Sequence, residues 1–308
     1  MGPTRTHSAG DPLKTEAAFL QVARSRPADY LTLTKPRVNG LVIASAAAAY
    51  YLGSAAGFDL VRFINTIVGT ALVAGGAAAL NQAFERRIDA LMERTRSRPV
   101  PDGRLSTADA RWFGLALAGI GVVELALGAN LLSAAIALVT LVTYAWVYTP
   151  LKTRTSFATV IGAVPGALPP MIGWAAATGT MSREAWILFA IVFFWQLPHF
   201  LAIAWMYRED YARAGVPLLP VLEPDGRSTA LQIVLYTSAL VPVSLLPTVV
   251  GLGGDVYFGA GLLLGIAFLA ASLVFARQRT RTNARALFLA SIVYLPVLWM
   301  LLVLDRVG

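Results

Sequence analysis

The chain has 308 residues, of which 57% are hydrophobic and 14% charged, and its mean hydropathy is +0.65. This composition is too apolar for a soluble globule and the chain is too long for a single anchor, so it predicts a polytopic membrane protein. The absence of cysteine excludes disulfides, thiolate catalysis, iron–sulfur clusters and cysteine-based zinc sites. The two histidines, His7 and His199, are too few for a multi-histidine metal site.

The amino-terminal segment, residues 1–34, is polar and contains Pro, Ser, Thr and charges of both signs. It has no apolar stretch ahead of a small-residue cleavage site, which argues against a secretory signal peptide. Its acidic residues argue against a mitochondrial transit peptide. We therefore expect residues 1–34 to form a mobile cytoplasmic tail and residues 35–308 to form a single transmembrane domain.

Nine apolar runs follow the tail, each long enough or nearly long enough to cross a bilayer as a helix. The run from 111 to 149 is almost continuous, but Gly128-Ala-Asn130 near its middle indicates two helices joined by a tight turn. The sequence thus predicts an all-α fold of about nine transmembrane helices. The expected spans cover residues 38–56, 61–82, 111–129, 131–149, 157–178, 185–206, 230–251, 256–276 and 286–304.

The basic residues lie almost entirely on one side of these spans. With nine spans, one side of the membrane receives 22 of the 25 Lys and Arg residues. The positive-inside rule places that side in the cytoplasm, together with the amino terminus, and places the carboxyl terminus outside. Because the charge belongs to membrane loops, we do not expect a nucleic-acid partner. We expect an integral protein of the bacterial cytoplasmic (inner) membrane.

Polar residues recur every four positions where the second span ends, at Asn81, Glu85 and Asp89. On a helix this spacing places them on nearly one face, along roughly 12 Å at the membrane edge. Oxygen ligands of this kind suit Mg²⁺, which commonly bridges carboxylates to substrate phosphates. Arg94 and Arg98 follow and can bind a diphosphate. The alternative is a solvated helix end with snorkelling arginines.

A second polar group follows the fourth span. Pro150 ends that span, and Tyr148, Lys152 and Arg154 surround it. The two cations would meet a diphosphate leaving group from the opposite wall of a site. The alternative is that these charges only reflect the positive-inside bias. We count all three residues as candidate diphosphate ligands.

A third group joins His199 near the end of the sixth span to Glu209 and Asp210 in the loop that follows. On an unbroken helix, His199 and Asp210 would lie within roughly 20° of one face, although Pro198 can kink the span. Glu209 and Asp210 could complete a metal and diphosphate site with the first motif. A lone histidine near a helix end is also often only a hydrogen-bonded structural residue.

At these residues the chain resembles the UbiA-type intramembrane prenyltransferases and, within that superfamily, the branch of protohaem IX farnesyltransferases (haem O synthases). The superfamily motif is matched by Asn81, Glu85 and Asp89, followed by Met-Glu-Arg-Thr-Arg-Ser-Arg-Pro at 92–99. The haem branch is matched by Trp-Gln-Leu-Pro-His-Phe at 195–200 and by Asp-Tyr-Ala-Arg-Ala-Gly-Val-Pro-Leu-Leu-Pro-Val at 210–221. His199 stands where other superfamily members carry Asp.

The resemblance implies helices around a central cavity and Mg²⁺ bound with farnesyl diphosphate at two acidic motifs. It further implies farnesylation of a vinyl group of haem B with addition of water, giving haem O, which a downstream haem A synthase would use. Haem B is expected as substrate, because one histidine cannot supply two axial ligands. The implied metal ligands are Asn81, Glu85, Asp89, Glu209 and Asp210, and the implied catalytic residues are Asn81, Glu85, Asp89, Lys152, His199 and Asp210.

Two alternatives are kept beside this interpretation. A related enzyme could prenylate an aromatic quinone precursor through the same diphosphate site. A small-solute transporter would instead carry polar residues and broken helices near the membrane midplane, whereas the polar residues here gather at one membrane edge.

Overall fold

The computed structural model describes residues 26–307, and its regular elements are helices, with one isolated bridge between Gly253 and Arg306. Eight helical stretches in this range are long and apolar enough to cross a membrane. They are α3 (Leu60–Phe84), α5 (Thr107–Gly128), α6 to α7 (Leu131–Leu151), α8 to α9 (Ala158–Thr178), α10 (Arg183–Met206), α13 to α14 (Arg227–Val249), α15 (Asp255–Arg277) and α16 (Arg281–Leu304).

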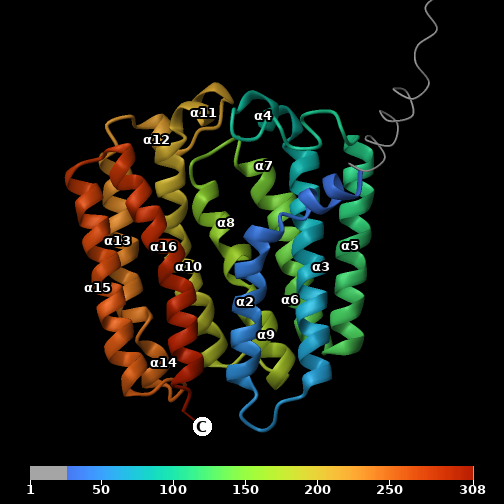
Figure 1. Cartoon of the computed structure of the whole chain (residues 1–308), viewed down its shortest axis with the longest axis vertical. Helices are drawn as coiled ribbons and strands as arrows, with labels where there is room; N and C mark the ends of the chain where they lie inside the picture. The colour runs from blue at the N-terminus through green and yellow to red at the C-terminus, as the bar shows by residue number, and fades with distance from the viewer. Residues whose placement is uncertain (1–25, 308) are drawn as a thin grey trace, which may run out of the picture.

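A ninth helix, α2 (Pro36–Gly53), runs alongside these stretches in the same bundle (Figure 1). Its first turn contains Arg37 and Asn39, which lowers its mean hydropathy. The all-helical membrane architecture predicted from the sequence is therefore confirmed, with span boundaries that differ by a few residues. The chain is an integral membrane protein.

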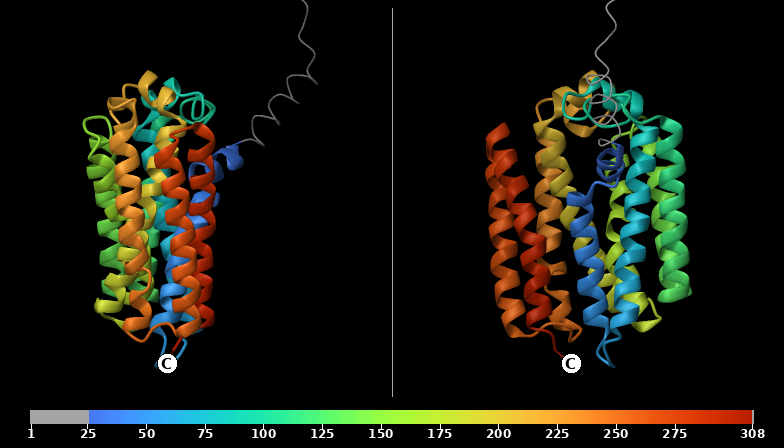
Figure 2. Two further views of the ribbon diagram at one scale, coloured as in Figure 1. Left: turned by 90° about the vertical axis from the view of Figure 1, so that its left-hand side faces the viewer. Right: turned by 45° about the vertical axis from the view of Figure 1, so that its right-hand side comes forward.

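The short helices that connect the spans gather at one end of the bundle, and the carboxyl terminus lies at the other (Figures 1 and 2). We call the first the basic end, because it carries most of the Lys and Arg residues of the loops. Trp112 and Trp146 are exposed near the basic end and Trp186 near the opposite one, as expected of aromatic residues at two membrane surfaces. The short helices of the basic end are α4 (Arg86–Leu91), α7 (Thr149–Leu151), α11 (Arg208–Arg213) and α12 (Leu219–Leu222).

Several spans are interrupted, and each interruption has a local cause. α8 (Ala158–Ala167) and α9 (Pro169–Thr178) meet at Leu168, where the following proline removes a backbone donor. Asn130 caps α6 by accepting a hydrogen bond from the Ser133 amide at 2.9 Å, which forms the predicted turn after Gly128. The remaining pieces are α6 (Leu131–Val142), the π-helix η1 (Thr143–Tyr148), α13 (Arg227–Val243) and α14 (Leu246–Val249).

Small residues hold α3 against α5 at close range. A Cβ added to Gly76 would lie 2.5 Å from the Gly114 carbonyl oxygen, and one added to Gly121 would lie 2.7 Å from the Gly69 carbonyl oxygen. α9 approaches α2 in the same way, because a Cβ on Gly173 would overlap the Ala46 carbonyl. Close packing of this kind is how helices associate in a bilayer, where burial against lipid offers little gain.

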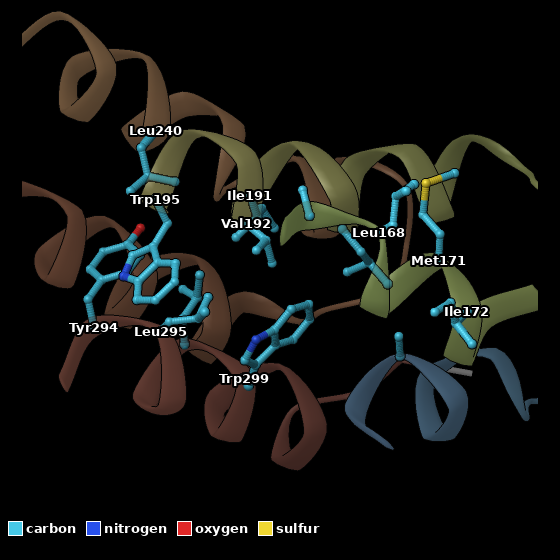
Figure 3. Packing of buried hydrophobic residues seen from close by; sticks show 14 of the residues in the cluster. Leu168, Met171, Ile172, Ile191, Val192, Trp195, Leu240, Tyr294, Leu295 and Trp299 are labelled. Carbon is cyan, nitrogen blue, oxygen red and sulfur yellow. The ribbon is translucent and has the colours of Figure 1, made fainter. Parts of the chain in front are cut away.

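Larger side chains fill the core around α10 (Figure 3). Trp195 of α10 lies beside Tyr294 and Leu295 of α16, and its indole nitrogen donates to the Ser291 carbonyl at 2.8 Å. Ile172 and Met171 of α9 extend the same cluster toward α2. α10 and α16 are thus fixed to each other near the middle of both helices.

Two expectations about the chain ends and breaks are corrected. Residues 26–33 form a helix whose Leu33 is fully buried and accepts a hydrogen bond from Gln82 at 3.0 Å, and Asp29 pairs with Arg104 at 3.4 Å. The mobile tail predicted to reach residue 34 is therefore wrong for 26–34, and residues 1–25 lie outside the described range.

α10 ends before Tyr207 (φ −114°), so His199 and Asp210 do not lie on one unbroken helix.

Candidate active site

The residues Asn81, Glu85 and Asp89 line one side of the helical segment at the basic end. α3 ends at Phe84 and α4 begins at Arg86, yet the backbone keeps its helical hydrogen bonds across the join. The Glu85 amide donates to the Asn81 carbonyl at 2.9 Å, and the Asp89 amide donates to the Glu85 carbonyl at 2.8 Å. All three side chains are buried, with exposures of 3%, 3% and 0%. The row therefore faces the protein interior and not the solvent.

Glu85 forms a buried ion pair with Lys152, which follows α7. The Lys152 ammonium donates to both Glu85 carboxylate oxygens, at 3.0 and 3.2 Å. Burial alone would raise the pKa of Glu85, but the ammonium groups of Lys152 and Lys35 outweigh burial and hold that pKa below its ordinary value. Burial would likewise lower the pKa of Lys152, but Glu85 raises it. Both groups are charged at neutral pH.

Asp89 is paired on one oxygen only. Its Oδ2 accepts a hydrogen bond from Arg98 at 2.7 Å, while Oδ1 is buried and has no hydrogen-bond partner within residues 26–307. Thr95 donates to the Asp89 backbone carbonyl at 2.9 Å and fixes the loop that returns Arg98 to the carboxylate. A fully buried carboxylate oxygen without a partner is costly, so it marks a position suited to a cation or a donor from a ligand.

Lys35 enters the site from the residue before α2. Its ammonium donates to the Asn81 side-chain oxygen at 3.2 Å. Among the described residues that are not glycine, Lys35 alone has a positive φ, 48°, and it precedes a proline, where helical geometry is disfavoured. Burial, together with the Arg98 guanidinium nearby, lowers the pKa of Lys35 to about 8. The motifs of the sequence do not predict Lys35 as part of the site, although Lys-Pro directly before the first span is a usable signal.

The π-helix η1 (Thr143–Tyr148) forms the wall opposite α3. Thr149 donates to the Tyr144 carbonyl at 2.8 Å, and the Asn81 amide donates to the Thr149 hydroxyl at 3.4 Å. The rings of Tyr144 and Tyr148 lie 5.5 Å apart, and Tyr148 packs so closely on Gly162 that a Cβ there would clash. Single π-helical turns often occur at functional sites because they redirect side chains. Here the turn places two aromatic rings beside the Glu85–Lys152 pair.

The second acidic segment covers the first. Arg94 donates to the Tyr211 hydroxyl at 3.2 Å, and its guanidinium lies 5.2 Å from the centre of the Tyr207 ring. Met92 packs in a small apolar cluster with Tyr211, Val216 and Leu218. Two loops more than 100 residues apart are therefore joined over the row of polar residues.

The predicted five-residue metal site is not assembled in the structure. Asp210 is buried and pairs with Arg213 on its own helix, whereas the adjacent Glu209 is exposed, because neighbouring helical residues point about 100° apart. Within residues 26–307, no three His, Asp or Glu side chains are close enough to hold a metal ion together. Arg154 is exposed and His199 faces α16, so neither contacts the row. Asn81, Glu85, Asp89, Lys152 and Arg98 do come together.

Comparison with known proteins places this arrangement in a family. The sequence profile of the UbiA prenyltransferase family matches residues 41–296, which is most of the chain. The chain belongs to the UbiA prenyltransferase family. Among UbiA proteins, the protoheme IX farnesyltransferase of Solibacter usitatus (strain Ellin6076) is 50% identical over 289 residues, covering 91% of this chain and 99% of that protein. The protoheme IX farnesyltransferase of Myxococcus xanthus (strain DK1622) is 46% identical, covering 91% and 95%.

Solved structures show the same UbiA fold at low sequence identity. A digeranylgeranylglyceryl phosphate synthase matches with a TM-score of 0.76 and 17% identity, over 90% of this chain and 97% of that one. A UbiA homologue from Archaeoglobus fulgidus, bound to GPP and Mg²⁺, matches with a TM-score of 0.63 and 14% identity, over 89% and 99%. These likenesses establish the helical arrangement around the site.

Proposed function

We propose that this chain is a protohaem IX farnesyltransferase. It would join C1 of farnesyl diphosphate to a vinyl group of haem B while the allylic C–O bond breaks and its electron pair leaves with diphosphate. Water adds a hydroxyl group to the other vinyl carbon and releases a proton, which gives haem O. The relative of this name from Solibacter usitatus is 50% identical to the chain over 99% of its own length. The observation that carries the proposal is the buried Asp89 carboxylate inside a cluster of cations.

The residues present fit Mg²⁺. The unpaired Oδ1 of Asp89, the Glu85 carboxylate and the Asn81 amide are oxygen ligands of the type that Mg²⁺ prefers. These three residues would hold the ion, and a homologue of the same fold carries Mg²⁺ with GPP. When bound, Mg²⁺ supplies positive charge to the departing diphosphate.

The basic residues around the row would bind the rest of the diphosphate. In the structure, Lys152 pairs with Glu85 and Arg98 pairs with Asp89. Lys35 adds a third cation beside Asn81. Cations held in a buried site stabilise charge on a leaving group more strongly than they would in water. Tyr144 and Tyr148 would shield the allylic carbon from water on the membrane side, since their rings line the wall above Gly162.

The basic end is proposed to face the cytoplasm, with the carboxyl terminus outside. The support is the charge count, because 22 of 25 Lys and Arg residues belong to that side of the chain. The chain has no cysteine, so single cysteines can report sidedness in intact cells. Arg279→Cys should be protected from an impermeant maleimide while Val307→Cys is labelled, and the reverse labelling would contradict the orientation.

The activity itself is tested with the purified full chain, farnesyl diphosphate, Mg²⁺ and haem B, followed by chromatography and mass spectrometry of the porphyrins. Haem O should form together with diphosphate, and chelation of Mg²⁺ should stop the reaction. In a parallel sample, 4-hydroxybenzoate replaces haem B as acceptor. Prenylated 4-hydroxybenzoate without any haem O would contradict the proposed acceptor.

A further inference from the structure

His199 lies in the second half of α10 and is held by α16. Its Nδ1 lies 2.7 Å from the Ser291 hydroxyl oxygen, and that hydroxyl donates its own proton to the Phe288 carbonyl at 2.6 Å. The Ser291 hydroxyl already donates its only proton to Phe288, so it can only accept a hydrogen bond from His199. The imidazole proton must therefore be on Nδ1 of His199. The Nε2 nitrogen therefore carries a free lone pair.

The Nε2 lone pair accepts no hydrogen bond from the residues that the structure describes. No side chain or backbone group within residues 26–307 hydrogen-bonds to Nε2, and no carboxylate pairs with the ring. Nε2 is also absent from the polar atoms of residues 26–307 that are fully enclosed and lack a partner, so part of its surface is left open. A neutral imidazole with a fixed tautomer and an open Nε2 is the usual form of a histidine that binds a metal.

Flat apolar groups surround the same ring. His199 stacks on Trp195 with centroids 5.1 Å apart, and Phe288 and Phe200 lie at 5.0 and 5.6 Å. Trp195 is itself fixed by its hydrogen bond to the Ser291 carbonyl, so one serine orients both rings. Aromatic faces and an open imidazole nitrogen together suit a planar, apolar macrocycle with a metal at its centre.

We propose that His199 Nε2 binds the iron of the haem B acceptor as its single protein axial ligand. The inference rests on the proposed function and adds how the acceptor is held. The lone pair forms a coordinate bond to iron, and no proton has to leave, because Nε2 is already unprotonated. Ser291 is a positioning residue that keeps the proton on Nδ1. A single protein ligand of this kind would hold the acceptor in register.

The test measures ferrous haem B bound to the purified full chain by resonance Raman spectroscopy. Wild type should show an iron–histidine stretching band that shifts on ¹⁵N-histidine labelling. His199→Gln keeps a donor for Ser291 but should lose the band, and external imidazole should restore a band in His199→Gly. His7→Ala should keep it, since His7 is the other histidine of the chain.

Ser291→Ala should weaken haem binding by about 10–100-fold, which is the usual loss when the partner of a metal-bound histidine is removed. Ser272→Ala is the matched control, because Ser272 is also buried and donates to a helix carbonyl, that of Phe268, at 3.0 Å. It should leave both the band and the affinity unchanged.

Haem O formation is measured by chromatography in the same samples, which separates the two claims. A wild type that makes haem O without an iron–histidine band, or a band that persists in His199→Gln, would overturn the axial ligand and leave the activity intact. A wild type with the band but without haem O would support the ligand and contradict the farnesyltransferase activity.

Discussion

The two acidic segments of the basic end look alike in sequence and differ in the structure. Each places carboxylates just beyond a membrane span, at Glu85 and Asp89 and at Glu209 and Asp210. The first pair is buried and neutralised by Lys152 and Arg98, which come from other elements, whereas Asp210 pairs with Arg213 of its own short helix. Glu209 is exposed. The first segment is built as a binding site, and the second packs over it as a cover through Tyr211 and Arg94.

The difference has a consequence for mutants. Removal of a buried charge that pairs with a residue of another element leaves its partner uncompensated, and it should lower activity more than removal of a charge paired within its own helix. The family resemblance implies that Asp89 and Asp210 are both metal ligands, so loss of either residue would be expected to abolish turnover. The structure predicts an asymmetry, in which the first segment carries the diphosphate chemistry and the second affects it indirectly. Four predictions test how far that asymmetry holds.

The largest effect is expected at Asp89. Asp89→Asn removes the carboxylate charge next to the proposed ion and should lower kcat/KM by about 10²–10³-fold, the usual cost of losing one preorganised group that stabilises the transition state. Haem O formation at saturating Mg²⁺ measures it. Asp102→Asn is the matched control, since Asp102 lies exposed in the following loop. A rate for Asp89→Asn equal to that of Asp102→Asn would contradict the site.

Lys152 and Arg154 allow a buried and an exposed basic residue of the same loop to be compared. Lys152 contacts Glu85 and is expected to contact diphosphate, so Lys152→Gln should lower kcat/KM by about 10²-fold, as a lost electrostatic contact to the leaving group does. Arg154→Gln should behave almost as wild type, because Arg154 is exposed. Equal losses in the two variants would show that general basic charge, and not the buried contact, is what matters.

A smaller effect should appear in the pH dependence of farnesyl diphosphate binding. Burial and the nearby Arg98 lower the pKa of Lys35 to about 8. The ammonium form predominates below that pH and is lost as pH rises, so KM for farnesyl diphosphate should increase about tenfold between pH 7 and 9. Lys35→Arg remains charged over this range and should flatten the profile. An identical profile in the variant would assign the pH dependence to another group.

The smallest effect is expected where the cover meets the site. Tyr211→Phe removes one hydrogen bond, to Arg94, and keeps the ring in its apolar cluster. A bond of this kind contributes about 0.5–1.5 kcal/mol, so kcat/KM should fall only a few-fold. Steady-state kinetics at fixed haem B would show this. A loss as large as that of Asp89→Asn would mean that the cover takes part directly in the chemistry.

Local patterns in the sequence predicted much of the fold and half of the site. The four-residue spacing from Asn81 to Asp89 placed these residues on one side because helical hydrogen bonds continue through Glu85. The lengths of the apolar runs predicted the succession of membrane helices, and Gly128-Ala-Asn130 predicted the turn between two of them. These features depend on neighbours in the chain, which is why sequence periodicity can report them.

The features that the sequence did not predict depend on distant contacts or on departures from regular geometry. Lys35 reaches Asn81 across 46 positions and from a strained backbone conformation. The π-helix at Thr143–Tyr148 has no hydropathy signal. The break at Tyr207 turned Asp210 away from the face of His199, and the partner of His199, Ser291, lies 92 residues further on.

The most direct test of the asymmetry between the two segments is equilibrium binding of a slowly reacting farnesyl thiodiphosphate, with and without Mg²⁺. Asp89→Asn and Asp210→Asn would be compared with wild type in the same detergent. The account predicts that Asp89→Asn abolishes the gain in affinity that Mg²⁺ gives, while Asp210→Asn keeps most of it. Loss of that gain in Asp210→Asn, with Asp89→Asn unaffected or equally affected, would contradict the assignment of the diphosphate site to the first segment.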